Sequence, residues 1–242
     1  MIKVHSYESM GTFDGPGLRM VVFLQGCDFR CKYCANPDTI VPKGESKLTD
    51  PAEIIRLALN EKPFFGKKGG VTFSGGEPMA QAKALIPLCK ELKALGIHTC
   101  LDTNGSIPNR HVKELLEVVD LVLLDVKEIN PERHRWLTGR NNIVTLETAK
   151  WLNAHKKPFW LRYVLVPSIT DSEEDIRTLC ETFQNYEFIE KVEILPYHTL
   201  GMHKYEAMNK PYLLEGIKEN TPEQLAKAKV LFEEYFKNVS VN

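Results

Sequence analysis

Short apolar runs rich in β-branched and aromatic residues alternate along the chain with longer segments in which apolar residues recur at helical spacing. The short runs predict six strands, at residues 20–24, 71–73, 97–101, 121–124, 159–166 and 192–195. The longer segments predict six helices, at residues 51–59, 80–95, 109–119, 145–155, 171–186 and 222–236. Asp50 before Pro51 supplies an N-terminal cap for one helix, and Gly96 supplies a C-terminal stop for another.

This alternation predicts the α/β fold class, with a parallel sheet, outer helices and right-handed crossovers. Six strands are too few for a closed eight-stranded barrel, so an open or partial barrel and a doubly wound sheet both fit the pattern. No repeat or shift of composition divides the 242 residues, and a chain of this length is within the range of one domain. We therefore expect a single domain over residues 1–242.

The charge of the chain is nearly balanced, with 31 Lys and Arg against 32 Asp and Glu and a formal net charge of -1. Nucleic acid binding relies on a surplus of cationic side chains, so nucleic acid is not expected as a partner. The longest apolar runs fall far short of the roughly 20 residues that cross a bilayer, and the first residues lack a signal-peptide pattern. We therefore expect a cytoplasmic protein without membrane contact and without a disulfide framework.

Small and polar residues follow the predicted strands at the points where the strands end. They include Gly26-Cys27, Ser74-Gly75-Gly76-Glu77, Asp102-Thr103, Asp125-Val126-Lys127 and Tyr197-His198. In parallel α/β folds, ligands bind beyond the carboxyl ends of the strands. This concentration of polar groups predicts a ligand site at that edge of the sheet.

Three of the six cysteines, Cys27, Cys31 and Cys34, lie within eight residues in the predicted loop after the first strand. Thiolates favour zinc or an iron–sulfur cluster. A structural zinc site needs four ligands, and no fourth Cys or His lies at suitable spacing. Three cysteines can instead hold three irons of a 4Fe–4S cluster and leave the fourth iron for a small molecule. The cluster is the favoured interpretation, and zinc or chance spacing are the alternatives. The other three cysteines are expected in the core: Cys89, Cys100 and Cys180.

The remaining polar groups at the strand ends have structural interpretations as well. Asp102 or Asp125 is suited to capping the next helix, but two carboxylates beside the hydroxyl of Thr103 also suit a hard cation. Lys127 requires an anionic partner if it lies near a buried edge. A lone histidine such as His198 is more often structural than functional, and only its place after the last predicted strand favours a site.

The segment Cys27-Asp28-Phe29-Arg30-Cys31-Lys32-Tyr33-Cys34 resembles the C-x3-C-x-aromatic-C signature of radical S-adenosylmethionine enzymes. In that family one electron from a reduced cluster cleaves the sulfonium C–S bond, which yields methionine and a 5′-deoxyadenosyl radical. The resemblance implies a 4Fe–4S cluster held by three cysteines, S-adenosylmethionine as cofactor, and a partial (β/α)6 barrel of the radical SAM type. Ser74-Gly75-Gly76-Glu77-Pro78 also looks like the Gly-Gly-Glu motif of the family.

Further segments resemble the glycyl-radical-enzyme activases within this family. Residues 11–19 are similar to the signature that precedes the cysteines, and the likeness continues through residues 71–78, 98–105, 121–127, 162–167 and 195–198. No cysteine lies between Cys34 and Cys89, so the chain lacks the insert that holds extra clusters in many activases. This absence favours the type that acts on pyruvate formate-lyase. Ala35 is a departure, because relatives often have histidine there.

The resemblance implies an oxidoreductase of anaerobic glucose metabolism, whose adenosyl radical abstracts hydrogen from a glycine Cα of pyruvate formate-lyase. It also implies flavodoxin or ferredoxin as the reductant, and we expect a monomer. Two alternatives stay open. One is an activase of another glycyl radical enzyme, and the other is a non-catalytic Fe–S or zinc regulatory protein.

The resemblance also implies roles for individual residues. Those implied to contact S-adenosylmethionine are Tyr33, Cys34, Ala35, Gly76, Asp125, Val126, Lys127 and His198. Those that resemble a monovalent cation site for Na+ or K+ are Asp102, Thr103, the carbonyl of Leu123, and Asp125. Asp14 and Arg19 are expected near the point where the glycine loop of the partner approaches.

Overall fold

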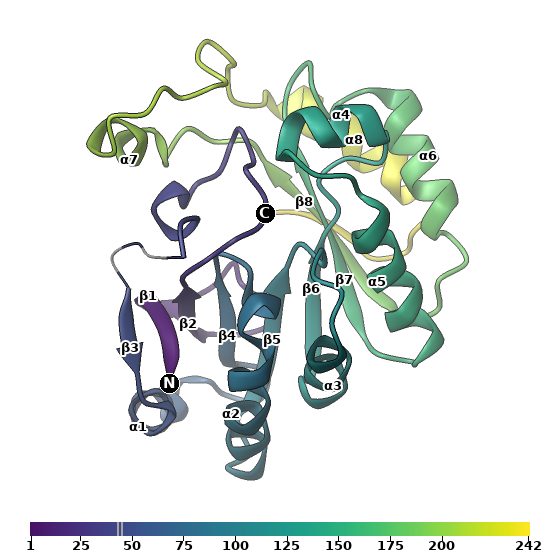
Figure 1. Cartoon of the computed structure of the whole chain (residues 1–242). Helices are drawn as coiled ribbons and strands as arrows, with labels where there is room; N and C mark the ends of the chain where they lie inside the picture. The colour runs from purple at the N-terminus through teal and green to yellow at the C-terminus, as the bar shows by residue number, and fades with distance from the viewer. Residues whose placement is uncertain (43, 45) are drawn as a thin grey trace. The chain divides into compact units, whose positions relative to one another are not determined.

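The computed structural model describes residues 1–42, 44 and 46–242. The chain folds into two compact units, one of Met1–Asp28 and Asp38–Leu123, the other of Phe29–Pro37 and Leu124–Asn242. Strands alternate with helices along both units, and most strand pairs are parallel (Figure 1). This arrangement confirms the predicted α/β class, whereas a single domain over the whole chain stays a prediction.

Three parallel strands form the centre of the first unit. Its strands are β1 (Ile2–Gly11), β2 (Arg19–Leu24), β3 (Lys47–Thr49), β4 (Gly70–Gly75), β5 (His98–Thr103) and β6 (Leu121–Asp125), the last of which continues into the second unit. β2, β4 and β5 are parallel, with Arg19 opposite Gly70 and Gly70 opposite His98. β1 runs antiparallel to both β2 and β3. The segments that follow β2, β4 and β5 therefore emerge at one edge of the sheet.

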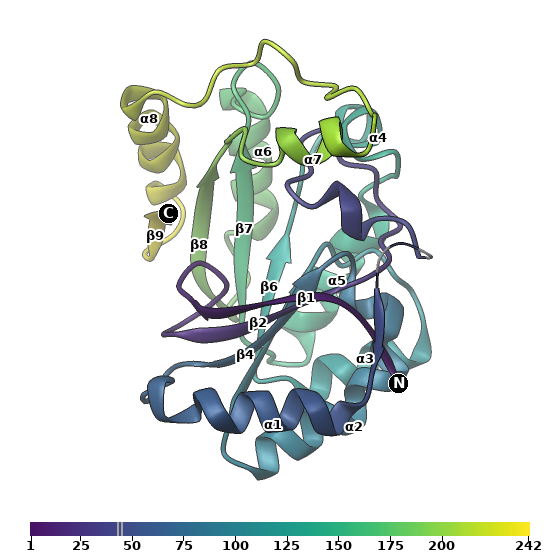
Figure 2. The ribbon, with the colours of Figure 1, turned by 90° about the vertical axis from the view of Figure 1, so that its left-hand side faces the viewer.

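Two helices of the first unit begin or end at the signals predicted for them, one at its start and the other at its end. They are η1 (Pro37–Thr39), α1 (Pro51–Glu61), η2 (Lys62–Phe64), η3 (Pro78–Gln81), α2 (Ala82–Ala94) and α3 (Arg110–Val118). Asp50 caps α1 by accepting a hydrogen bond from the Ala52 amide at 2.9 Å. Gly96 has φ 67°, a left-handed conformation that glycine adopts without strain, and it follows the end of α2. α1 and α2 lie side by side in this unit (Figure 2).

A fully buried arginine fixes the amino ends of the central strands. The Arg19 side chain donates hydrogen bonds to the Pro16 carbonyl at 2.9 Å, the Val71 carbonyl at 2.8 Å and the Thr72 hydroxyl at 2.5 Å. Thr72 in turn donates to the carbonyl of Asp14 at 2.6 Å. Arg19 thus lies opposite to the edge that carries the polar strand ends. The Arg19 side chain is used inside the unit, and a place for Arg19 near the approach of the glycine loop stays a prediction.

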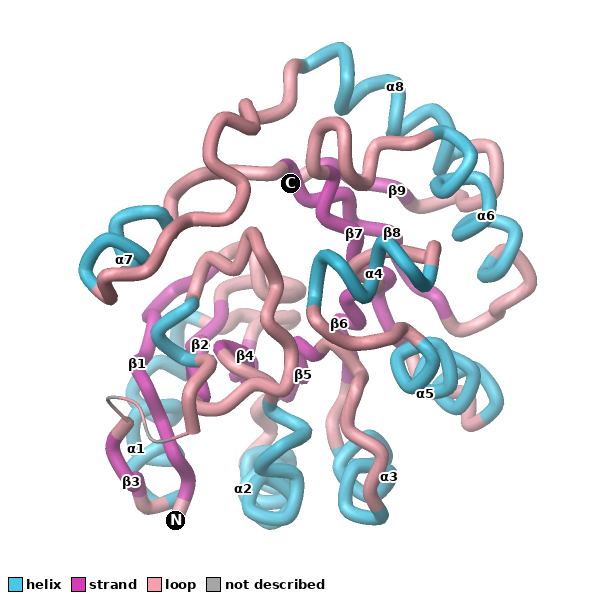
Figure 3. The backbone as a smooth tube through the Cα atoms, turned by 45° about the horizontal axis from the view of Figure 1, so that its top comes forward, coloured by secondary structure: helices cyan, strands magenta, loops and turns pink. Residues whose placement is uncertain are grey.

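The second unit is built on parallel strands covered by helices. Its elements are α4 (Pro131–Thr138), α5 (Ile143–Ala154), β7 (Phe159–Leu165), α6 (Glu173–Phe183), β8 (Ile189–Pro196), α7 (Met202–Ala207), α8 (Pro222–Glu233) and β9 (Val239–Val241). β8 pairs in parallel with both β7 and β9. α7 and α8 are joined by a long connection, which Figure 3 shows as an extended loop. No helix of the described residues is long and apolar enough to cross a membrane.

The six predicted strands and six predicted helices are confirmed, with shifts of a few residues at their ends. Five elements were not predicted: β1, β3, β9, α4 and α7. β3 and β9 are three residues long, too short to show a period. α4 has four charged or ionisable residues among its eight, in Pro-Glu-Arg-His-Arg-Trp-Leu-Thr, so its apolar periodicity is weak.

Replacing Arg19 by methionine should destabilise the protein. Met fills much of the same volume but removes the buried hydrogen bonds to the Val71 carbonyl and the Thr72 hydroxyl, so we expect a loss of about 3 kcal/mol in the free energy of unfolding. Urea denaturation of the Arg19→Met protein under anaerobic conditions measures this loss. Lys68→Met is the matched control, because the Lys68 side chain is exposed. A loss below about 1 kcal/mol would contradict the structural role of Arg19.

Candidate functional site

Gly76 allows the segment after β4 to pack directly against the backbone of Gly26 in the segment after β2. The Gly76 amide donates to the Leu24 carbonyl at 2.8 Å, and the Glu77 amide donates to the Gly26 carbonyl at 2.8 Å. A Cβ on Gly76 would lie 2.4 Å from the Gly26 oxygen, so no larger residue fits there without a shift of the backbone. Gly76 therefore lies directly against the backbone that leads into Cys27.

The carboxylate of Glu77 connects the segments after β4 and β5. It is fully buried and accepts hydrogen bonds from the Met79 amide at 2.8 Å, the Thr103 hydroxyl at 2.6 Å and the Asn104 amide at 2.9 Å. Burial raises the pKa of Glu77 to about 8, although these three hydrogen bonds act in the opposite direction. From the sequence, Glu77 was expected at the polar edge of the sheet and in the segment that resembles the Gly-Gly-Glu motif. Glu77 also caps η3, which it precedes, but the bonds to Thr103 and Asn104 could not be read from the sequence.

The first unit brings Cys27 next to the segment that follows β5. The side-chain amide of Asn104 lies 3.7 Å from Cys27 Sγ as a hydrogen-bond donor. Asp102 accepts a hydrogen bond from the Ser74 hydroxyl at 2.6 Å. Residues predicted to lie at the carboxyl edge of the sheet therefore contact one another within this unit. They form two small groups, one around Glu77 and one around Ser74.

In the second unit, the segment Phe29–Pro37 carries Cys31, Tyr33, Cys34 and Ala35 and is attached to α4. The Arg30 amide donates to the Thr138 carbonyl at 2.7 Å, and the Lys32 amide donates to the Leu137 carbonyl at 3.0 Å. The same segment lies close to the start of α7, where a Cβ on Gly201 would come within 2.8 Å of Ala35 Cα. Backbone contacts therefore position this segment, together with the buried Phe29 ring, whose centre lies 5.4 Å from that of His134 on α4.

Lys127 has an anionic partner within the chain. Its ammonium lies 2.8 Å from Asp125 Oδ2, and both side chains are about 15 % exposed. Burial opposes the charge on Lys127, but Asp125, Tyr33 and Cys31 together outweigh it, and the pKa of Lys127 lies above its usual range. The Lys127 ammonium also lies 5.8 Å from the centre of the Tyr33 ring. Asp125 Oδ1 and the Tyr33 hydroxyl are buried polar atoms for which no hydrogen-bond partner is found among the described residues.

The other predicted site residues lie in different settings. Val126 is buried, and its amide donates to the Arg162 carbonyl at 3.0 Å. His198 follows β8 and is exposed. Leu123 is buried within the part of β6 that belongs to the first unit, with Asp102 and Thr103, whereas Asp125 belongs to the second. The cation site that combines these residues stays a prediction, as does the contact of His198 with a nucleoside.

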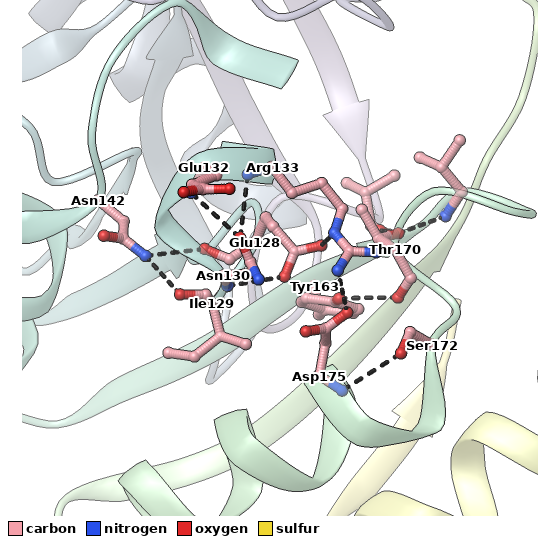
Figure 4. A network of polar contacts seen from close by, with 12 residues as sticks. Glu128, Ile129, Asn130, Glu132, Arg133, Asn142, Tyr163, Thr170, Ser172 and Asp175 are labelled. Atoms are coloured by element: carbon pink, nitrogen blue, oxygen red, sulfur yellow. Dashed lines mark hydrogen bonds and ion pairs between the residues drawn. The ribbon is translucent and has the colours of Figure 1, made fainter. Parts of the chain in front are cut away.

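A buried polar network next to Lys127 was missed by the sequence analysis (Figure 4). Arg133 lies 2.8 Å from Asp175 and 3.4 Å from Glu128, two carboxylates that it bridges from α4. The Asn130 amide donates to Glu128 at 3.0 Å. Burial raises the pKa of the Glu128 carboxyl to about 7, and Asp175 adds to this shift. No sequence signal joins these groups, because α4 itself was not predicted.

The donor chemistry of the cysteines fits an iron–sulfur cluster. All six are free thiols, and the three core cysteines are buried as predicted, whereas those of the C-x3-C-x2-C segment are only partly buried: Cys27, Cys31 and Cys34. Three free thiols on one short segment are suited to iron, and soft thiolate ligands favour it. Among the described residues, no three His, Cys, Asp or Glu side chains already form a metal-binding group. The fit thus rests on ligand type and spacing.

Comparison with known proteins identifies the class. A family model described as the Radical SAM superfamily matches residues 21–180. The structure resembles that of Streptococcus suis SuiB bound to S-adenosylmethionine, with a TM-score of 0.66 and 19 % identity over 89 % of this chain and 48 % of that one. This likeness confirms the predicted radical SAM fold. The chain is therefore a radical SAM enzyme, with a 4Fe–4S cluster and S-adenosylmethionine as cofactors.

Curated relatives define the family more narrowly. Pyruvate formate-lyase-activating enzyme of Streptococcus mutans is 44 % identical, over 98 % of this chain and 95 % of that protein. The enzyme of the same name from Staphylococcus epidermidis is 46 % identical, over 93 % of this chain and 92 % of that protein. The chain belongs to the family of pyruvate formate-lyase-activating enzymes within the radical SAM superfamily.

Replacing Glu128 by glutamine should alter how stability depends on pH. The pKa of Glu128 is about 7 in the folded chain against 4.5 for an ordinary glutamate. Between these values the unfolded chain binds fewer protons, so the contribution of Glu128 to stability is full at low pH and is lost as pH rises through the folded pKa. In the Glu128→Gln protein we expect the free energy of unfolding to fall less between these two pH values than in the parent protein. Urea denaturation from roughly pH 5 to roughly pH 8 measures it.

The exposed Glu132 on α4 offers a matched control for this experiment. Glu132→Gln removes the same charge from the same helix region and should leave the pH profile of the parent unchanged. If the free energy of unfolding of the Glu128→Gln protein fell with rising pH as much as that of the parent, the assignment of this pH dependence to Glu128 would be contradicted.

Proposed function

We propose that the chain activates pyruvate formate-lyase by forming a radical on a glycine of that enzyme. The observation that carries the proposal is the identity of 44–46 % with activating enzymes over nearly the whole chain. The three free cysteines of the C-x3-C-x2-C segment support it as well. Other glycyl-radical-enzyme activases share the chemistry, and the missing cysteine-rich insert favours pyruvate formate-lyase as the partner.

Different residues of the chain would hold the cluster and bind S-adenosylmethionine. Cys27, Cys31 and Cys34 would hold the cluster and leave one iron open. When bound, the cluster and S-adenosylmethionine supply a 5′-deoxyadenosyl radical. Asp125 and Lys127 offer a buried charge pair with one unused carboxylate oxygen. Such a pair is suited to the charged amino acid end of S-adenosylmethionine.

Further residues complete the proposed contacts with S-adenosylmethionine. Gly76 offers backbone at close range, and Val126 extends the Asp125–Lys127 segment. Tyr33 and Ala35 would contact the cofactor from the cysteine segment, largely through backbone, and His198 would contact the nucleoside. We propose Na+ or K+ at Asp102, Thr103, Leu123 and Asp125, flavodoxin or ferredoxin as the reductant, and a cytoplasmic monomer.

A backbone glycine of the partner suits this chemistry. Loss of a hydrogen atom from its Cα leaves a radical that both flanking peptide groups stabilise, and glycine has no side chain to block approach. The hydrogen atom goes to the adenosyl radical, which becomes 5′-deoxyadenosine. One S-adenosylmethionine and one electron are consumed for each glycyl radical.

Activation of pyruvate formate-lyase tests the proposal directly. The anaerobically reconstituted protein, with S-adenosylmethionine and dithionite, should give the EPR doublet of a glycyl radical on purified pyruvate formate-lyase. It should also form 5′-deoxyadenosine in equal amount. A protein that cleaves S-adenosylmethionine but activates only another glycyl radical enzyme would overturn the choice of partner. Zinc binding without cleavage would overturn the enzyme assignment.

Removing one cluster thiol should abolish the cluster, whereas removing a core thiol should not. We expect reconstituted Cys31→Ala protein to lose the iron content of about four per chain and the reduced-cluster EPR signal. Cys180→Ala is the matched control, because Cys180 is buried in α6 and should affect only stability. Retention of the signal in the Cys31→Ala protein would contradict the ligand assignment.

A further inference from the structure

A cluster of basic residues surrounds the junction between the cysteine segment and α4 in the second unit. We define this basic patch by five residues: Arg30, Lys32, Arg135, Trp136 and Arg140. The backbone bonds from Arg30 to Thr138 and from Lys32 to Leu137 hold the two segments together. A Cβ on Gly139 would lie 3.6 Å from Arg30 Cβ, which shows how closely they approach. The patch is thus fixed by backbone structure.

The charge of these segments departs from that of the whole chain. Residues 29–37 and 131–140 contain five Arg and Lys and a single acidic residue, Glu132, whereas the entire chain has 31 basic and 32 acidic residues. One of the five, Arg133, is engaged with Glu128 and Asp175. The other four belong to the patch, and Arg30, Arg135 and Arg140 among them are exposed.

An exposed aromatic ring lies in the middle of these charges. Trp136 is 53 % exposed, and the Lys32 ammonium lies 4.8 Å from the centre of its ring. Tryptophan and arginine are enriched among the residues that contribute most to protein–protein affinity. An exposed tryptophan in contact with a lysine, on segments rich in exposed arginine, therefore has the composition of a docking surface.

We propose that the basic patch is the docking surface for an acidic one-electron carrier protein, an inference that rests on the proposed function. Arg30 and Lys32 flank Cys31 in the sequence, so a protein seated here lies against the segment assigned to the cluster. Electron transfer falls steeply with distance, and this position makes the path short. The reduced carrier loses one electron and the oxidised cluster gains it, with no proton or atom transferred.

The charge of the patch selects the carrier rather than the glycyl radical enzyme as its occupant. A positive surface accelerates the encounter with an acidic partner and weakens as salt screens it. Such steering suits a carrier that must bind, deliver one electron and leave. A glycine loop that must reach bound S-adenosylmethionine needs a path into the site, and a fixed exposed helix end does not offer one.

A charge-reversal variant separates docking from catalysis. Arg135→Glu with Arg140→Glu should weaken the binding of an acidic flavodoxin to the reconstituted protein by about tenfold or more, and flatten the dependence of affinity on salt. Titration followed by fluorescence anisotropy measures the affinity. Stopped-flow bleaching of the cluster by reduced flavodoxin should slow by a similar factor. Glycyl radical formation driven by dithionite should match that of the parent, because dithionite needs no docking surface.

Two further variants serve as control and as independent test. Lys150→Glu with Lys237→Glu makes the same change of charge at exposed positions outside the patch, and should leave affinity and salt dependence unchanged. Trp136→Ala keeps every charge, and should weaken flavodoxin binding by about tenfold with an unchanged salt dependence. This variant tests the patch even if the double reversal does not fold.

Several outcomes would overturn the proposal. Unchanged flavodoxin affinity in the double reversal and in Trp136→Ala would show that the carrier binds elsewhere. An equal loss of dithionite-driven activation would assign the patch to the glycyl radical enzyme instead. If the parent formed no glycyl radical with dithionite, the proposed function would fail, and the binding comparison would still decide whether the patch receives an acidic carrier.

Discussion

The buried carboxylate of Glu77 is the interaction on which the polar edge of the first unit depends. A carboxylate without solvent is costly unless hydrogen bonds compensate, and Glu77 receives three. Two of its donors come from the segment after β5, and its own amide binds the Gly26 carbonyl before Cys27. One residue therefore ties together the segments that follow three parallel strands. The position of the first cysteine depends on the same bonds that hold Thr103 and Asn104.

In the second unit, both backbone and side-chain contacts order the cysteine segment, whose Phe29 is buried against His134 of α4. The cysteine segment obtains its position from backbone bonds to α4 and from close packing against Gly201. Because Arg133 on α4 bridges the buried carboxylates of Glu128 and Asp175, the helix that supports this segment is itself fixed by charge. Loss of that bridge would be transmitted to the cysteine segment through α4, without any direct contact with a thiol.

The sequence predicted the parallel strands and their polar ends because period and position are local properties. The apolar run at 121–124 followed by Asp125 and Lys127 gave both the strand and two candidate site residues. The Asp125–Lys127 pair itself was foreseen only as a need of Lys127 for an anion, since the partner lies two residues away across a strand end. The bridge from Arg133 to Glu128 was not foreseen, because it depends on how α4 packs. The buried hydrogen bonds of Arg19 were not foreseen for a related reason, because they join residues that are far apart in the sequence.

The net charge of the chain does not predict how charges are distributed locally, and the second unit shows this. The value of -1 for the chain argues against an extended nucleic acid surface, which needs a surplus of cations along its length. The net charge does not show whether a short segment carries an excess of one sign of charge. At Asp125 and Lys127 opposite charges meet in a buried setting and cancel, which leaves one acceptor oxygen for a ligand. On the cysteine segment and α4 like charges gather at the surface instead. Because buried pairs resist salt and exposed clusters are screened by it, ionic strength should separate the two kinds of site even where both serve one reaction.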